Sequence, residues 1–384
     1  MAVAALGLLA ALLRRRWGWA LLIAGMAGVS LSMRRNIAPA AMLIVPIAAA
    51  ALTDLFRRPV ERLSASARAR ATTVLAVLVA AASAALSLSV ASNDFYYRDR
   101  RFTRFGLGMS ALKVPVEAAA FVDENITGVV WCDFNSSSNF HFLTRPHRPV
   151  PVLTNTWSYP PAVLRESLDY SLDRRPFAQA VADYNVSAVV LRVDAASERL
   201  ARKLMLDSNW ALVHLDGYHA VFVRRDGPDG SLAEQAIDPE TFDVAAYKLR
   251  LAGLDANRAF ALRLGGTTLG RIASAFPPPV EPPAQRKPIA WENAAIDCLR
   301  SAIELNAKDD ESWTVLGLCL ARRGYRRIIA SDFAGGERDW SEAQRCFQEA
   351  VRLRPGNEAA VQDLAIVKDQ LRSLAGGVIK AGKW

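Results

Sequence analysis

The feature that most constrains the fold of this chain is the crowding of apolar residues into positions 1–91. Long apolar runs lie there at about 17–33, 37–56 and 71–91. A helix rises about 1.5 Å per residue, so roughly 20 apolar residues cross the hydrocarbon core of a bilayer. We therefore predict that residues 1–91 form transmembrane helices with these three spans. The chain is expected to be a multi-pass integral membrane protein held in a lipid bilayer.

Arginine placement predicts the orientation of these spans. The loop between the second and third spans contains five arginines, at positions 57, 58, 62, 68 and 70. Loops rich in Lys and Arg stay on the cytoplasmic side. The large C-terminal part, from residue 92 onward, is then expected outside the cytoplasm. Arg34 and Arg35 would lie at the outer membrane edge, where they either contact a ligand or simply form a charged helix end.

Residues 2–13 are apolar but too short to span a bilayer. No basic segment precedes them and three arginines follow, which is not the pattern of a signal peptide. We expect these residues to be the tail of a longer helix, as in a truncated or split version of a larger membrane protein. The alternative is a short amphipathic start that lies on the membrane surface.

Charge and cysteine content exclude some function classes. The net charge of +9 comes from basic clusters that lie between apolar runs, and we find no platform of basic and aromatic residues suited to nucleic acid. The four cysteines form no CxxC pair and have no His at zinc-ligand spacing. We therefore predict no nucleic-acid partner, no metal site and no cofactor.

Residues 92–226 change character, because short apolar runs alternate there with helical patterns. Strands are expected at 128–134, 149–155, 186–193, 210–217 and 218–225. Strand–helix alternation predicts a small three-layer α/β domain with a partly parallel sheet, and the last two strands predict an antiparallel hairpin.

Ligands of such sheets bind beyond the carboxyl ends of strands, which directs attention to "CDFNSSSNFHF" at 132–142. Asp133, Asn135, Ser136 and His141 form a possible ligand site there. A hydrolase would need a triad around Ser136 and His141, but the chain has no GxSxG elbow, and polar loops after strands are ordinary. We assign no catalytic residue, and whether the chain is an enzyme stays open.

Two helical patterns mark the C-terminal part. The first places Trp313, Leu316, Gly317 and Leu320 at offsets 0, 3, 4 and 7, and the second places Ala343, Phe347, Ala350 and Pro355 at offsets 0, 4, 7 and 12. Residues of about 255–374 thereby resemble tetratricopeptide repeats. The resemblance implies an all-α repeat array over 240–384, interrupted by a Pro-rich insert at 276–288. Such arrays bind a protein or peptide partner, although a short one can instead pack on its own neighbouring domain.

Two details of the array stay open. The two patterns are farther apart than in a regular repeat, so the insert at 325–339 lengthens either the connection or the helices. Residues 358–374 form either a third first helix or a capping helix.

The order of parts over about 17–226 resembles a second family. The spans, the Arg-rich loop and "VPVEAAAFVDEN" followed by "GVVWCDFNSSSNFHFL" are similar to the C-terminal end of GT-C-like polytopic membrane glycosyltransferases. The resemblance implies an extracytoplasmic α/β domain after the last span. The catalytic acid of that family sits in an early loop, and no position here matches it.

Two functions follow. The first is a membrane-anchored tetratricopeptide-type protein that acts as a protein-interaction scaffold. The alternative is the C-terminal portion of a GT-C-like glycosyltransferase whose catalytic N-terminal half is missing.

Overall fold

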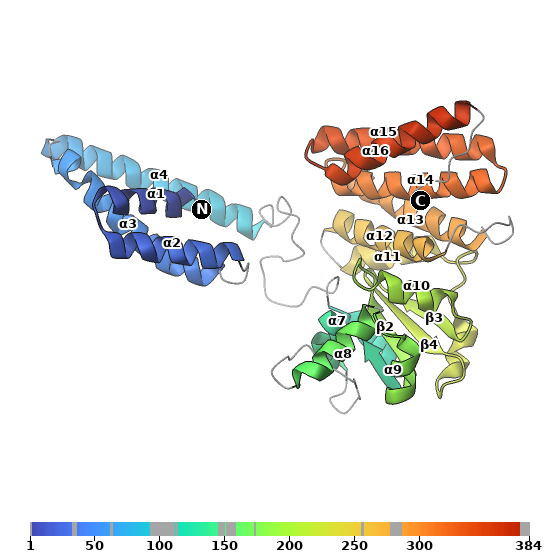
Figure 1. Ribbon diagram of the computed structural model, residues 1–384. Coiled ribbons are helices and arrows are strands. Elements are labelled where there is room, and N and C mark those ends of the chain that lie inside the picture. Colours follow the sequence, from blue (N-terminus) through green and yellow to red (C-terminus); the bar gives the residue numbers. More distant parts are fainter. Residues whose placement is uncertain are drawn as a thin grey trace. The chain divides into compact units, whose positions relative to one another are not determined.

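The computed structural model describes residues 2–32, 37–61, 64–92, 112, 114–144, 150, 159–172, 174–254, 257–276 and 286–376. The chain divides into two compact units, Met1–Arg101 and Phe102–Trp384, and each is described by itself (Figure 1). Across the described residues the chain is mostly helical, with one small mixed sheet.

The described residues of the first unit form four helices. They are α1 (Ala2–Leu13), α2 (Trp17–Ser32), α3 (Ile37–Glu61) and α4 (Ala65–Ala91). Helix α4 begins earlier than the predicted span because the Ser64 hydroxyl accepts a hydrogen bond from the backbone N–H of Ala67 and caps it. Within the described residues, α4 is the one helix long and apolar enough to cross a membrane, and three spans stay a prediction.

Small side chains form the contacts among α1, α2 and α3. Buried positions include Ala4, Gly7, Ala10, Ala11, Ala20, Ala48 and Ala51, together with Ile23 and Ile44. At Gly7 a Cβ atom would lie 2.3 Å from the Cβ of Ala48, so the close approach of α1 and α3 requires glycine at this position. Large apolar side chains point the other way, and Leu21 and Met42 are 73% and 77% exposed.

Two basic turns lie at one end of this helix cluster. The Arg14 guanidinium donates a hydrogen bond to the carbonyl of Leu55 (2.9 Å), and Arg16 pairs with Asp54 (3.2 Å). The turn after α1 and the end of α3 that leads to the Arg-rich loop are therefore neighbours. The predicted orientation requires this arrangement, although the side of the membrane stays a prediction.

The second unit contains a four-stranded sheet of order β1-β2-β4-β3. Its strands are β1 (Val129–Cys132), β2 (Val186–Arg192), β3 (Trp210–Leu215) and β4 (His219–Arg224). Strand β1 pairs parallel with β2, while β4 is antiparallel to both β2 and β3. The predicted partly parallel sheet with a final hairpin is thus confirmed. Of the strand predicted at 149–155, only residue 150 is among the described residues.

Helices cover both faces of the sheet. On one face the core includes Trp131, Leu191 and Phe222 with side chains of α8 (Pro161–Ser171), α9 (Phe177–Tyr184) and α10 (Glu198–Leu206). On the other face it includes Val130, Val190 and Val221 with side chains of α6 (Val116–Asn125), α7 (Phe134–Leu143) and the 3-10 helix η3 (Gly230–Gln235). The alternation of inward side chains along each strand therefore buries both sides.

Six α-helices follow the sheet within the described residues. They are α11 (Val244–Leu254), α12 (Arg258–Ala275), α13 (Arg286–Leu305), α14 (Asp310–Ile329), α15 (Phe333–Leu353) and α16 (Glu358–Ala375). Helix α12 packs mainly on α13, α14 packs mainly on α15, and α16 packs on α15 (Figure 1). Their core is continuous with the first face of the sheet. The insert at 325–339 lengthens α14 and α15 themselves, because only 330–332 connect them.

Candidate functional site

The carboxyl ends of β1, β2 and β3 meet at one edge of the sheet, because these three strands run in the same direction. The turn between β3 and β4 lies at this edge too. Ionisable side chains gather there, namely Asp133, Arg192, Asp194, Asp216 and His219. This is the edge at which α/β sheets usually bind ligands.

Asp133 connects β1, β2 and α7. Its Oδ1 accepts hydrogen bonds from the backbone N–H groups of Asn135 (3.0 Å) and Ser136 (3.2 Å), which caps α7. Its Oδ2 accepts from the backbone N–H of Arg192 (3.1 Å), at the end of β2. Both carboxylate oxygens of this buried residue are therefore engaged by backbone groups.

Ser136 belongs to a Ser–His–Asp chain. Its Oγ lies 3.4 Å from Nε2 of His219, and Nδ1 of His219 lies 3.2 Å from Oδ2 of Asp216. The three residues come from α7, the first position of β4 and the β3–β4 turn. None of them is more than 3% exposed.

Asp216 organises the tight turn between β3 and β4. Its Oδ1 accepts hydrogen bonds from the backbone N–H groups of Tyr218 (2.7 Å) and His219 (2.5 Å). Burial by itself raises the pKa of Asp216. Attraction to the His219 ring and these hydrogen bonds outweigh burial, so the pKa lies below its usual value. The carboxylate is thereby ionised at neutral pH and orients His219.

The Ser–His–Asp chain has the atoms of an acyl-transfer triad but lacks other parts of that machinery in the described structure. Such a site needs free N–H donors for the oxyanion and access for a substrate. The N–H groups of Asn135 and Ser136 are already bound by Asp133, and the trio is buried. The arrangement therefore braces α7 against the β3–β4 turn.

The four residues predicted to form one site separate in the structure. Asp133 and Ser136 lie at the sheet edge, whereas Asn135 is exposed. His141 is half-buried, and its Nδ1 has no hydrogen-bond partner among the described residues. The ring that reaches Ser136 is that of His219.

Sequence reasoning missed Asp216 and His219. Their signal was an Asp three residues before a His, across a tight turn at the strand edge. Arg34 and Arg35 lie outside the described residues. The described residues contain no group of three or more His, Cys, Asp or Glu side chains that could hold a metal ion.

The residues of the two repeat patterns gather between α14 and α15. Leu316, Leu320, Ala343, Phe347 and Ala350 are buried. A Cβ atom at Gly317 would lie 2.8 Å from the Phe347 ring, so glycine lets the two helices approach. Trp313 is half-buried, its Nε1 donates to the carbonyl of Ala307 (2.9 Å), and Pro355 is exposed in the turn after α15.

A buried ion pair joins α13 to α14. The Arg326 guanidinium donates to Oε1 of Glu292 (3.1 Å), and it also donates to the carbonyls of Ala273 (3.1 Å) and Phe276 (2.8 Å). Burial raises the pKa of Glu292 to about 7, although Arg326 and its neighbouring arginines lower it. The sequence patterns gave no sign of this pair.

Helix α12 docks on the carboxyl edge of the sheet. The Thr268 hydroxyl donates to the carbonyl of Gly217 (3.1 Å), and Arg271 donates to the carbonyl of Val193 (2.9 Å). Helix α12 is therefore packed against the sheet within the chain.

Comparisons with known proteins add no relative. No protein-family model, curated protein or solved structure matches this chain. The resemblances to tetratricopeptide repeats and to GT-C-like glycosyltransferases therefore rest on the residue patterns alone.

Proposed function

We propose that this chain is a multi-pass integral membrane protein that acts as a protein-interaction scaffold. Helices α1–α4 hold it in the bilayer, and the helices after the sheet bind a protein or peptide partner. The observation that carries the proposal is the burial pattern of these helices: small side chains fill most buried positions of α1–α3, many large apolar ones are exposed, and α4 buries no residue.

Water does not favour such a surface. Burial of apolar area contributes roughly 25 cal/mol per Å², so a soluble protein turns its large apolar side chains inward. Helix α4 has 27 residues and none of them is buried. Lipid tails are as apolar as leucine, so helices in a bilayer associate through small residues that let backbones approach. The contact of Gly7 with Ala48 is of this kind.

The partner-binding part of the proposal rests on the helical pairs. Consecutive antiparallel helices with a glycine opposite a phenylalanine, as at Gly317 and Phe347, match the packing that the tetratricopeptide pattern implies. Repeat arrays present side chains of successive helices to a ligand. Val361, on the last helix α16, is an apolar residue that is 46% exposed.

Two measurements test the proposal. Membranes that contain the full chain are washed with alkaline carbonate, and we expect the chain to stay in the pellet. A photo-crosslinking residue at position 361 is then compared with one at the exposed Glu234 of η3. We expect a discrete adduct at 361 alone. Release by carbonate contradicts the anchor, and equal labelling at both positions contradicts recognition through the array.

A further inference from the structure

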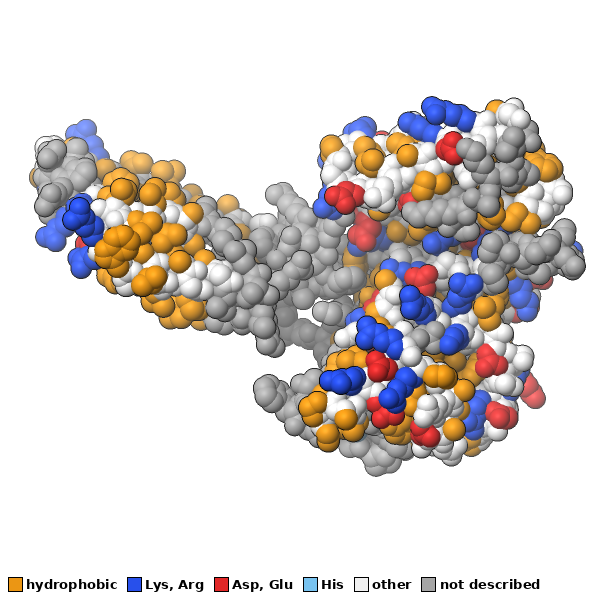
Figure 2. Space-filling model, in the orientation of Figure 1, with side chains coloured by type: hydrophobic (Ala, Val, Ile, Leu, Met, Phe, Trp, Pro, Cys, Tyr) orange, Lys and Arg blue, Asp and Glu red, His pale blue; other side chains and the backbone are white. Residues whose placement is uncertain are grey.

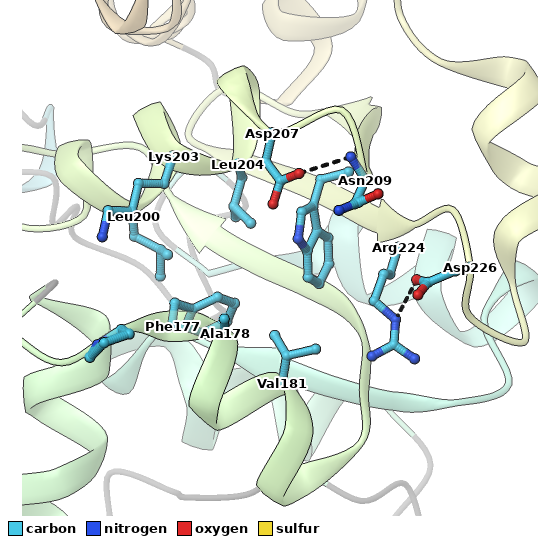
Figure 3. Close-up of a pocket in the computed structure, with 12 residues that line it drawn as sticks. Phe177, Ala178, Val181, Leu200, Lys203, Leu204, Asp207, Asn209, Arg224 and Asp226 are labelled. Carbon is cyan, nitrogen blue, oxygen red and sulfur yellow. Dashed lines mark hydrogen bonds and ion pairs between the residues drawn. The ribbon is translucent and has the colours of Figure 1, made fainter.

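A pocket of about 340 Å³ opens between α9, α10 and the adjoining ends of β3 and β4. Apolar side chains form one part of its lining, namely Phe177, Val181, Leu200, Leu204 and Trp210, and polar residues form the other part, namely Lys203, Asp207, Asn209, Arg224 and Asp226. Figure 3 shows Phe177 and Val181 from α9 facing Leu200 and Leu204 from α10. The volume lies at the lower end of the roughly 300–1,000 Å³ that small-molecule pockets occupy, so it suits one large side chain.

Two carboxylates line this pocket, and each has a hydrogen-bond or ion-pair partner within the chain. Asp207 accepts a hydrogen bond from the backbone N–H of Asn209 (2.9 Å), and Asp226 pairs with Nε of Arg224 (2.9 Å), as the dashed lines in Figure 3 mark. On α10 itself, the one acid, Glu198, accepts a hydrogen bond from the hydroxyl of Ser274 (3.4 Å).

Cationic side chains dominate the outer face of α10. Arg199, Arg202 and Lys203 are exposed there, and Lys203 also lines the pocket. Figure 2 shows Lys and Arg side chains gathered on the surface over α10. A partly apolar recess next to such a face is complementary to a ligand that combines an apolar group with negative charge.

We propose that this pocket receives one large apolar side chain of an acidic segment in a partner protein, and that Arg199, Arg202 and Lys203 bind the flanking carboxylates. Interfaces concentrate affinity in a buried apolar anchor within a pocket, while charged rims provide orientation and fast association. The inference rests on the proposed scaffold function and goes beyond it, because it adds a partner contact at α9 and α10 and names the class of partner.

A labelled peptide tests the inference on the full chain in nanodiscs of neutral phosphatidylcholine. The probe is the fluorescein-labelled peptide DELWED, followed by fluorescence anisotropy. Two control peptides are DEAAED, which lacks the apolar group, and KKLWKK, which reverses the charge. We expect both controls to bind at least tenfold more weakly than DELWED. Equal binding of either control overturns the inference, as does failure of DELWED to bind.

Substitutions then locate the binding. Ala178 is exposed on α9 and lines the pocket, so Ala178→Trp fills its mouth. Gln179 is also exposed but does not line it, so Gln179→Trp is the matched control. We expect at least a tenfold loss of affinity for Ala178→Trp and no change for Gln179→Trp. Equal affinities of the two variants overturn the inference.

Charge reversal completes the test. We expect Arg202→Glu combined with Lys203→Glu to weaken peptide binding at least tenfold and to flatten its salt dependence. If the basic face instead binds phosphatidylserine nanodiscs and DELWED does not compete, an anionic membrane surface is the occupant and the inference is wrong. The carbonate wash and the crosslink at position 361 do not involve this pocket. Their outcome therefore tests the scaffold proposal independently of the peptide-binding measurements.

Discussion

The two units of this chain bury opposite kinds of side chain. In Phe102–Trp384, the tryptophans 131, 291 and 340 are all 2% exposed or less, and the core runs continuously from the sheet to α16. In the described part of Met1–Arg101, alanines and Gly7 fill most of the buried positions, while leucines such as Leu21 and Leu75 face outward. The helices of the two units therefore pack in different ways. Burial of large apolar side chains drives packing in water, whereas close backbone approach is expected of helices in lipid, which we propose as the surroundings of the first unit.

Polar groups follow the same division. The second unit buries Asp133, Asp216 and Glu292, and each has a hydrogen-bonding partner. In the described part of the first unit, the acid Asp54 lies near one end of the helices and pairs with Arg16. A water-solvated core can hold a paired polar group, whereas a helix surface in lipid excludes one.

The largest expected effect contrasts one residue from each unit. Phe347→Ala removes a fully buried ring and should destabilise the second unit by about 3–5 kcal/mol. Leu78→Ala, at a side chain that is 61% exposed on α4, should leave helix packing unchanged. Thermal unfolding of the full chain in detergent, followed by tryptophan fluorescence, measures both. Comparable destabilisation by the two substitutions would break the comparison.

A pH series sharpens the comparison within the second unit. The folded-state pKa of Glu292 is about 7, above its ordinary value of 4.5, so the native state keeps a proton that the unfolded chain releases. The protonated Glu292 side chain therefore stabilises the folded state fully at pH values below 4.5. This stabilisation, on the order of 3 kcal/mol, is lost as the pH rises through about 7. Hydrogen exchange of α13 and α14 measures this dependence of stability on pH. We expect Glu292→Gln to abolish it.

The exposed Glu304, on the same helix, provides the control for that series. Glu304→Gln should leave the pH dependence of the wild type in place. If Glu292→Gln and the wild type give parallel curves from pH 4.5 to 8, the buried ion pair does not set the dependence.

A substitution of glycine probes the small-residue contacts of the first unit. Gly7→Leu places a side chain where a Cβ would already be 2.3 Å from Ala48, and such overpacking costs about 1–3 kcal/mol. A Cβ atom at Gly18 meets no atom within 4 Å, so we expect Gly18→Leu to leave the packing of α1 on α3 unchanged. Hydrogen exchange of α1 and α3 in nanodiscs compares them. Equal protection in both variants would mean that α1 does not pack closely on α3.

The smallest effect is expected at the Ser–His–Asp chain. Ser136→Ala removes one weak hydrogen bond to His219 and should lower the free energy of unfolding by about 1 kcal/mol. Ser231→Ala, at an exposed serine, is the control and should leave the free energy of unfolding unchanged. A fluorophosphonate probe should not label the wild type. Labelling that disappears in Ser136→Ala would assign a nucleophile to this edge.

Much of the architecture could be predicted from the sequence. The β-branched run at 186–193 and the paired runs at 210–225 predict β2 and the β3–β4 hairpin, because alternating or buried apolar patterns are local properties. The repeat spacing predicts which side chains lie between α14 and α15, since helical periodicity places residues three and four apart on one face. The carboxyl edge of the sheet follows from strand direction once the strands are known.

The contents of that edge could not be predicted in the same way. His141 is five residues from Ser136 in the chain, yet His219 is its neighbour in space because the pairing of β2 with β4 brings them together. The Glu292–Arg326 pair joins two helices, and the α12 contacts with Gly217 and Val193 join the array to the sheet. Each depends on long-range packing that no window of sequence contains.

The sequence by itself determined where apolar surface and helical or strand periodicity lie, and hence which segments are predicted to prefer lipid, sheet or repeat packing. Tertiary structure decided which polar groups meet, that the insert lengthens α14 and α15, and that α12 covers the sheet edge. The reason is physical: periodicity acts over a few residues, whereas partners for buried charge are chosen by whichever distant segments the core brings into contact.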